Sequence, residues 1–235
     1  MAGRLYLIPT LIAESDLSLV VPSGVSQVVG GLRHFVVEEE STAQRFLKKI
    51  RKDFPFDQCR FWELNEHTPA VEVKKIFAEV RSGDVGLLSE AGVPCVADSG
   101  ANLVWLAQEA GMSVIPLAGA SAIILALMAS GLNGQNFAFN GYLPKEKDAR
   151  VKKVKLLEQR SLQEGQTQLF METPYRNDPL FKELLEICDP RTLLCVALDL
   201  TGPDQMVRTQ GVRQWRAGNF ACPKVPALFL IQLTR

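Results

Sequence analysis

Three short turns carry the residues best suited to ligand binding in this 235-residue chain. Each follows an apolar run and contains glycine: residues 89–94, 117–122 and 140–144. Small residues at such turns leave backbone N–H and C=O groups within reach of a ligand. Because α/β proteins bind cofactors at the ends of their strands, this pattern predicts a site for a small polar molecule.

Two carboxylates near these turns have more than one interpretation. Glu90 follows an apolar run, where it could meet a hydroxyl or a cation, or belong to an ordinary exposed turn. Asp98 precedes a predicted helix, so that Asp98 or Ser99 could cap the helix or contact a ligand. Residues 119–122 begin another predicted helix, and their free N–H groups could receive a polar ligand group.

Strands alternating with helices must position these turns. Apolar runs predict strands at residues 4–8, 35–37, 59–64, 85–88 and 113–117, with helices at 24–32, 43–52, 69–81 and 102–110. The later residues predict strands at 137–140, 167–171, 193–198, 205–209 and 227–233, with helices at 120–130, 148–163 and 177–188. The expected fold class is α/β, with a mostly parallel sheet in a domain of residues 1–116 and a mixed sheet in a domain of residues 117–235.

Charge and cysteine content narrow the class of protein. Lys and Arg number 26, and Asp and Glu also number 26, so the chain lacks the overall basic excess that nucleic-acid-binding domains usually carry. Residues 150–155 nevertheless form a basic stripe. The five cysteines show no Cys-x-x-Cys pair, so we expect reduced thiols in a cytoplasmic chain and no metal site. Residues 113–132 carry no charge, but Pro116 and Gly119 predict a buried strand, turn and helix there and no membrane span.

The turn after the first strand lacks a dinucleotide signature. It reads Ile-Pro-Thr-Leu-Ile-Ala over residues 8–13, without the Gly-x-Gly-x-x-Gly pattern that brings backbone against a pyrophosphate. A phosphate-binding Walker motif is missing as well. Neither a nicotinamide nor a flavin dinucleotide is therefore the expected ligand.

The ordered set of turns is more specific than any one of them. It runs Ser-Glu-Ala-Gly-Val-Pro, Ala-Asp-Ser-Gly, Val-Ile-Pro-Leu-Ala-Gly-Ala-Ser-Ala, Ser-Gly-Leu, Phe-Asn-Gly-Tyr-Leu-Pro-Lys and Phe-Met-Glu-Thr-Pro-Tyr-Arg. This set resembles the S-adenosylmethionine-dependent tetrapyrrole methylase superfamily, most closely its branch that methylates a ribose 2′-hydroxyl of small-subunit ribosomal RNA. The resemblance extends from residue 5 to the C-terminus and is densest over residues 85–145.

The resemblance implies a homodimer of two-domain α/β subunits, with the methyl donor S-adenosylmethionine folded into the interdomain cleft and ribosomal RNA of the small subunit as substrate. Much of the contact to the donor would come from backbone. The donor-binding residues that it implies are Pro9, Ser89, Glu90, Ala91, Gly92, Val93, Asp98, Ala120, Ser121, Ala122, Met171, Leu198 and Ala227.

Methyl transfer to a hydroxyl would benefit from a general base within hydrogen-bonding distance. The available carboxylates are Glu14, Glu38, Glu39, Glu66 and Asp98. We favour Glu14 and Glu66 as catalytic residues, because loops at strand ends point toward the site.

Two other functions stay open at this point. One is methylation of a tetrapyrrole or another small molecule, although the glycine-rich motifs typical of that branch are absent. The other is a non-catalytic dimer that binds the donor, which the altered turn at residues 10–14 favours. The sequence identifies neither the acceptor nor the methylated atom.

Overall fold

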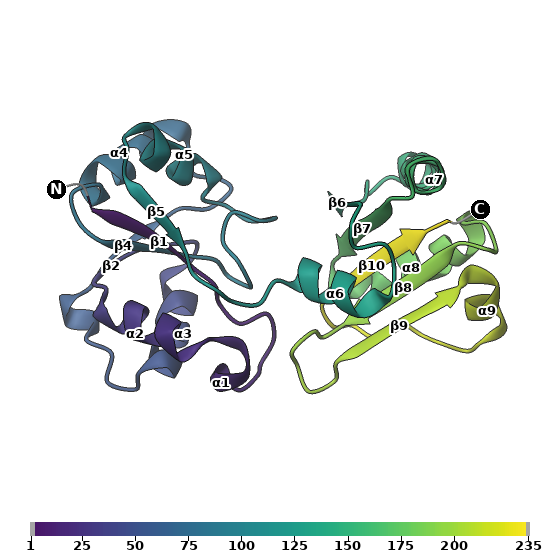
Figure 1. The fold of residues 1–235 in the computed structure, drawn as a ribbon, viewed down its shortest axis with the longest axis horizontal. Helices are drawn as coiled ribbons and strands as arrows, with labels where there is room; N and C mark the ends of the chain where they lie inside the picture. The colour runs from purple at the N-terminus through teal and green to yellow at the C-terminus, as the bar shows by residue number, and fades with distance from the viewer. Residues whose placement is uncertain (1–2, 234–235) are drawn as a thin grey trace. The chain divides into compact units, whose positions relative to one another are not determined.

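Strands and helices alternate along residues 3–233, the part of the chain that this computed structural model describes (Figure 1). They form two compact units, Met1–Ser121 and Ala122–Arg235. The predicted end of the first domain, residue 116, lies before the turn that leads to the next helix.

The first unit is built on a five-stranded sheet in which every pairing is parallel, with the strand order β3-β2-β4-β1-β5. In a parallel sheet the carboxyl ends of all strands share one edge, so the turns that follow them lie together. The strands are β1 (Arg4–Ile8), β2 (His34–Val37), β3 (Arg60–Glu63), β4 (Val85–Leu88) and β5 (Ser113–Pro116).

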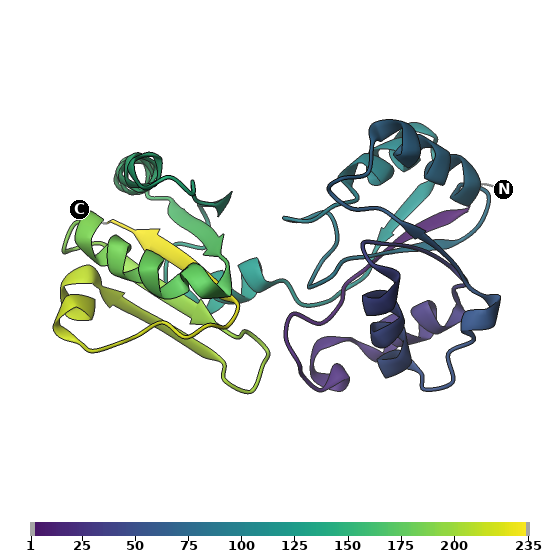
Figure 2. The ribbon, with the colours of Figure 1, turned by 180° about the vertical axis from the view of Figure 1, so that it is seen from behind.

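Helices cover both faces of this sheet, as Figures 1 and 2 show. Ile8 and Phe35 face a core formed with α1, α2 and α3, whereas Leu5 and Val36 face the core formed with α4 and α5. The central strands β2, β4 and β1 are apolar apart from the exposed first residues His34 and Arg4, because both faces of these strands are buried. The helices are α1 (Leu17–Val20), α2 (Ser23–Gly31), α3 (Glu40–Ile50), α4 (Ala70–Val80) and α5 (Ala101–Glu109), with a 3-10 turn at Phe56–Gln58.

The second unit contains a mixed sheet with the order β6-β7-β10-β8-β9. β6 and β7 are parallel, and the pairings of β10 with β7 and β8, and of β8 with β9, are antiparallel. The strands are β6 (Phe137–Tyr142), β7 (Thr167–Glu172), β8 (Leu193–Leu198), β9 (Met206–Gly211) and β10 (Ala227–Gln232).

One helix covers one face of the second sheet and three cover the other. Ile123 and Leu127 of α6 pack on one face, while Phe181 and Trp215 pack with α7 on the opposite face. The indole N–H of Trp215 donates to the carbonyl of Leu194 at 2.8 Å, which satisfies the polar atom of a buried ring. The helices are α6 (Ala122–Ser130), α7 (Lys147–Glu164), α8 (Asn177–Ile187) and α9 (Val212–Ala217), with a 3-10 turn at Pro174–Arg176.

The predicted fold class is confirmed: a parallel sheet in the first unit and a mixed sheet in the second. The uncharged stretch of residues 113–132 forms strand β5 and helix α6, as predicted. Within residues 3–233, no helix combines the length and the apolar character that crossing a membrane requires. The short helix α1 was not predicted; Asp16 caps it by accepting a 2.9 Å hydrogen bond from the N–H of Ser18.

Candidate functional site

The turns after β1 and β4 are bonded to each other at the carboxyl edge of the first sheet. The N–H of Thr10 donates to the carbonyl of Gly92 at 2.8 Å, and the hydroxyl of Ser89 donates to the same carbonyl at 2.9 Å. The Thr10 hydroxyl also donates to the carbonyl of Ser89 at 3.2 Å. Thr10 and Ser89 are both buried, so this network fixes the two turns as one rigid element.

The turn after β5 joins the same edge at two glycines, one required by lack of space and the other favoured by its backbone conformation. A Cβ on Gly119 would lie 2.2 Å from Cγ of Pro9, closer than atoms can pack. A Cβ on Gly92, whose φ is +78°, would lie 3.5 Å from the carbonyl oxygen of Ala120. The structure therefore brings together Pro9, the turn of residues 89–93 and the turn that reaches Ala120 and Ser121, as the sequence analysis expected of neighbouring strand ends.

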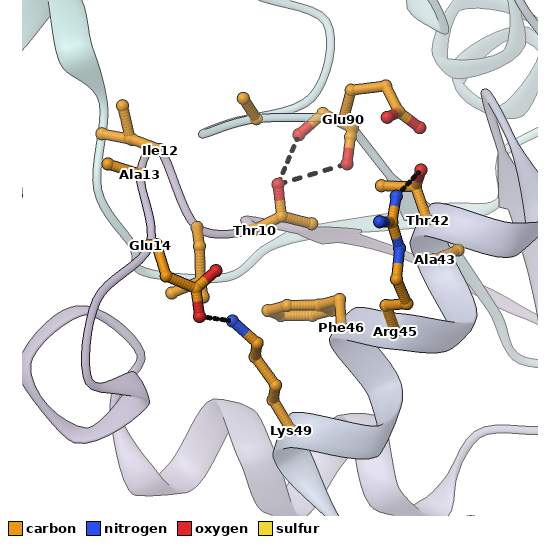
Figure 3. Close-up of a pocket in the computed structure, with 13 residues that line it drawn as sticks. Thr10, Ile12, Ala13, Glu14, Thr42, Ala43, Arg45, Phe46, Lys49 and Glu90 are labelled. Carbon is orange, nitrogen blue, oxygen red and sulfur yellow. Dashed lines mark hydrogen bonds and ion pairs between the residues drawn. The ribbon is translucent and has the colours of Figure 1, made fainter. Parts of the chain in front are cut away.

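A cavity of about 290 Å³ opens beside this edge (Figure 3). Its wall includes the turn after β1, the turn after β4 and one side of α3 from Thr42 to Lys49. Glu14 accepts a hydrogen bond from Nζ of Lys49 at 2.6 Å, and Arg45 donates to the hydroxyl of Thr42 at 2.9 Å. The cavity thus combines main-chain groups, one carboxylate paired with a lysine, and an arginine without a carboxylate partner among the described residues.

Glu90 is the second carboxylate of this cavity. Partial burial raises the pKa of Glu90, and the nearby charges of Glu38 and Glu39 act in the same direction, whereas a hydrogen bond from Thr42 and the charge of Arg45 oppose them. A carboxylate that is harder to ionise is a better proton acceptor once it is charged.

Asp98 lies elsewhere, in a cavity of about 200 Å³ that also includes Glu66. Neither Asp98 nor Ser99 caps the following helix, which corrects the cap interpretation; α5 begins after Gly100, and no side chain caps it. Ser99 instead donates its hydroxyl to Glu38 at 2.8 Å. The short strand β2 ends at Val37, and this places Glu38 next to the loop of Asp98.

The ionisation of Asp98 and that of Glu38 are linked. Burial, a hydrogen bond to Glu38 and its negative charge raise the pKa of Asp98 to about 8. Burial opposes ionisation of Glu38 as well, but hydrogen bonds from Asp98 and Ser99 lower the pKa of Glu38 below its ordinary value. Oδ2 of Asp98 is buried and has no hydrogen-bond partner among the described residues, so no donor stabilises a negative charge on that oxygen.

The Asp98→Asn variant is expected to remove a pH dependence of stability. Between the ordinary pKa of 3.8 and about 8, unfolded Asp98 loses its proton while folded Asp98 keeps it, so the free energy of unfolding falls as pH rises. Asparagine cannot ionise, and the variant should gain melting temperature relative to the wild type between pH 5 and 8.5. Thermal unfolding across this range measures it, with Asp57→Asn as the control for an exposed carboxylate. Parallel pH profiles of wild type and Asp98→Asn would contradict a raised pKa of Asp98 in the folded chain.

Glu14 and Glu66 line different cavities of the first unit. Glu14 has an 87% exposed side chain and is held by Lys49, whereas Glu66 has an 85% exposed side chain beside His67. Only Glu14 shares its cavity with Thr10 and Ser89.

The second unit gathers three of the residues expected to contact the donor at one edge of its sheet. Leu198 pairs with Ala227, and Ala227 pairs with Glu172, the neighbour of Met171. The antiparallel direction of β10 brings its first residue beside the last residues of β7 and β8. Leu198 and Ala227 are buried and Met171 is half-buried, so these three residues give this edge an apolar surface. Ala122, the first residue of α6, belongs to the same unit.

The contribution of α3 to the first cavity was not predicted. Arg45 and Lys49 are four residues apart, a spacing that puts them on one face of a helix. That spacing is visible in the sequence, but the packing of α3 beside the turn after β1 is a tertiary contact that the spacing does not specify.

Comparison with protein families gives one match over most of the chain. The sequence profile of the tetrapyrrole (corrin/porphyrin) methylases matches residues 25–214. Among curated proteins, the chain is 34% identical over 202 residues to ribosomal RNA small subunit methyltransferase I of Vibrio cholerae, covering 85% of this chain and 66% of that protein. It is 30% identical over 208 residues to the protein of the same name from Bacillus subtilis, covering 85% of this chain and 64% of the relative. The chain thus spans less than two thirds of the length of these relatives.

Solved structures share the fold at low sequence identity. The methyltransferase CobJ matches with a TM-score of 0.61 at 16% identity, over 99% of this chain and 94% of that one. Uroporphyrin-III C-methyltransferase from Thermus thermophilus, solved with S-adenosylhomocysteine, matches with a TM-score of 0.54 at 16% identity, over 98% of this chain and 97% of that one.

Proposed function

Because the chain belongs to the tetrapyrrole (corrin/porphyrin) methylase family, we propose that it is a methyltransferase that uses S-adenosylmethionine and methylates a ribose 2′-hydroxyl of small-subunit ribosomal RNA. The observation that carries the proposal is the edge where the turns after β4, β1 and β5 meet, with Gly92 at its centre. A side chain at Gly92 would fill the space between these turns, which a ligand bound through backbone would need.

The residues proposed to hold the donor belong to both units. In the first unit they lie at the bonded turns and include the exposed Ala91 and the half-buried Ala120. In the second unit they lie at the edge formed by Met171, Leu198 and Ala227, whose apolar side chains suit an adenine ring. Asp98 lies away from the bonded turns and would reach the donor only from the neighbouring cavity.

When bound, S-adenosylmethionine supplies a methyl group on a sulfonium, which is already a strong electrophile. The chain's own task is therefore to orient the acceptor oxygen and to remove its proton. The rigid bonding of Thr10 to the Ser89–Gly92 turn keeps the binding surface fixed. Glu14, oriented by Lys49, is the proposed base for an acceptor hydroxyl in the cavity beside that surface.

RNA is proposed as acceptor because the curated relatives are named as methyltransferases of small-subunit ribosomal RNA. Arg45 and Lys49 agree with such an acceptor, since cationic side chains beside a target hydroxyl can contact the flanking phosphates. We propose further that the enzyme works in the cytoplasm as a homodimer; light scattering of the purified chain measures the subunit number.

Glutamine variants separate the two candidate bases. Glu14→Gln should lower the rate of methyl transfer by at least about tenfold, since a positioned base contributes roughly 10²–10⁴-fold, without changing donor affinity. Glu66→Gln removes an equally exposed carboxylate from the other cavity and should leave the rate unchanged. A rate lost in Glu66→Gln and kept in Glu14→Gln would place the acceptor beside Asp98.

The proposed activity is tested by transfer of a labelled methyl group. Purified chain, labelled S-adenosylmethionine and small ribosomal subunits from cells lacking the gene should yield labelled RNA, with the mark mapped to a ribose 2′-oxygen. Label in a porphyrin acceptor and none in RNA would instead support a small-molecule methylase. Bound donor with no transfer to any acceptor would support a non-catalytic binder.

A further inference from the structure

Charge is distributed unevenly between the two units of this neutral chain. Residues 122–235 carry 15 Lys and Arg against 11 Asp and Glu, whereas residues 1–121 carry 11 against 15. An excess of one sign on part of a protein sets a local potential even where the net charge is zero. The cations of the second unit therefore offer a place where a polyanion could bind.

Helix α7 and the loop before it hold a cluster of these cations. We call it the α7 basic surface: Lys145, Lys147, Lys152, Lys155 and Arg160, all exposed. Lys152 and Lys155 are three residues apart and so share a face of the helix. From Lys147 to Arg160 the helix rises by about 20 Å, which is long enough to meet several phosphates.

The charges of this surface are not neutralised by the described residues. None of its five side chains forms an ion pair within residues 3–233. The nearby acid Glu158 is occupied elsewhere, since it accepts hydrogen bonds from the N–H of Asp189 at 2.8 Å and from the hydroxyl of Thr192. Glu146 and Asp148 are exposed beside Lys145 and Lys147 but form no ion pair within residues 3–233, so the exposed cations of this surface still outnumber its exposed acids.

Arg150 has a different task, although the sequence placed it in the basic stripe. It is bonded to Glu183 and donates to the carbonyls of Pro144 at 3.1 Å and Lys145 at 2.6 Å. Its charge is therefore used inside the unit, where it fixes the loop that carries Lys145. Lys152 and Lys155 of the same stripe form no ion pair within residues 3–233 and so stay available to a partner.

An aromatic side chain stands at the start of this surface. Tyr142, the last residue of β6, is 58% exposed and precedes Lys145 by three positions. Exposed aromatic rings beside a row of cations are the combination that binds single-stranded nucleic acid, since bases stack on the ring while cations contact the phosphates. A folded acidic protein would need no such ring. A lipid surface would need several apolar side chains along the helix, whereas Leu156, 42% exposed, is the one large apolar side chain that the described residues of α7 expose.

We propose that the α7 basic surface binds the phosphate backbone of single-stranded RNA, with Tyr142 stacking on one base. This inference rests on the proposed function, which makes RNA the acceptor, and it assigns the surface that holds the RNA outside the catalytic cavity. The surface would hold the RNA through its backbone and would not select the methylated nucleotide, because phosphate contacts carry no sequence information.

Fluorescence anisotropy with a labelled single-stranded RNA of about 16 nucleotides, the upper end of single-strand site sizes, tests the proposal. Lys152→Glu/Lys155→Glu should weaken RNA binding at least tenfold. It should also make the plot of log affinity against log salt concentration less steep by about 1.4, because each lost phosphate contact removes about 0.7 from the slope. The control, Lys52→Glu/Lys74→Glu, makes the same change of net charge with two exposed cations of the first unit and should bind as the wild type does. Tyr142→Ala should weaken binding without altering the salt slope, and Tyr142→Phe should restore it.

Equal losses in the α7 variant and the control would overturn the assignment of the surface. RNA binding absent from the wild type, with anionic vesicles bound at α7 instead, would overturn the choice of partner. Calorimetry with S-adenosylhomocysteine separates these results from failure of the proposed function. If the α7 variant still binds this compound, the methyltransferase proposal stands whatever the RNA result. If the wild type does not bind it, the methyltransferase proposal is wrong.

Discussion

The Gly92→Trp variant is expected to lose measurable binding of S-adenosylhomocysteine, with affinity at least 100-fold below that of the wild type. Gly92 has a φ of +78°, and its Cα faces the carbonyl of Ala120 and the side chain of Ile12. An indole at this position would fill the space between the turns after β4, β5 and β1. A left-handed conformation costs a residue with a Cβ roughly 1–2 kcal/mol, so some stability is lost as well.

Two matched variants isolate the steric effect. Gly111→Trp has the same kind of strain, with φ at +67° and open space around its Cα, but it lies before β5 at the amino edge of the sheet. It should lose similar stability and keep its affinity. Gly92→Ala adds the strain without the bulk and should bind more weakly than the wild type by much less than Gly92→Trp. Calorimetry that gave Gly92→Trp and Gly111→Trp equal affinities would place the donor away from this turn.

Arg150→Met is expected to destabilise the chain by about 3 kcal/mol or more, the lower end of the cost of breaking a buried ion pair. The side chains of Arg150 and Glu183 are only 16% and 10% exposed, and the pair joins α7 to α8. Without Arg150, a buried carboxylate loses its charged partner, and Oε1 of Glu183 already accepts no hydrogen bond from the described residues. Urea unfolding of the purified variant measures the loss.

A second substitution tests whether the lost partner is the cause. Arg150→Met/Glu183→Leu removes both charges and should recover most of the stability, because the uncompensated carboxylate disappears with its partner. Arg191→Met breaks the exposed pair with Asp189 and should leave the unfolding midpoint unchanged. A double variant no more stable than Arg150→Met would show that the hydrogen bonds from Arg150 to the carbonyls of residues 144 and 145 matter more than the charge pair.

The strands of both sheets could be predicted because burial dictates their composition. β4 and β8 are nearly continuous apolar runs, since both of their faces are covered, and such runs are visible without any structure. The mixed character of the second sheet followed from strands that come close together in sequence at the C-terminus. Helix ends were less certain: α6 begins at Ala122 and not at residue 120, because Gly119 is packed against Pro9 in the preceding turn.

The meeting of the turns after β4, β1 and β5 was predictable in outline, because carboxyl ends of parallel strands share an edge. Their bonding was not, since nothing in the sequence pairs Thr10 with Gly92 across the sheet. The same limit hid the link between the ionisation of Glu38 and that of Asp98, which follows from two loops meeting after β2 and β4. Contacts between segments far apart in the chain decide which carboxylates lie buried beside one another and which stay exposed.

Resemblance supplied what periodicity could not. The family assignment made from the ordered turns is confirmed by the profile match over residues 25–214. It pointed to Met171, Leu198 and Ala227 as a set, and the register of β7, β10 and β8 brings these three to one edge. The acceptor side had no such guide, and the positions of Arg45 and Lys49 in the wall of the cavity follow only from the packing of α3.

Calorimetric titration of the purified wild-type chain with S-adenosylhomocysteine measures whether this fold binds an adenosyl compound. We expect saturable heat with one molecule bound per chain, lost in Gly92→Trp and kept in Gly111→Trp. No heat at millimolar concentrations of the compound, from a chain shown to be folded by its thermal unfolding, would contradict the claim that this fold is used to bind an adenosyl methyl donor.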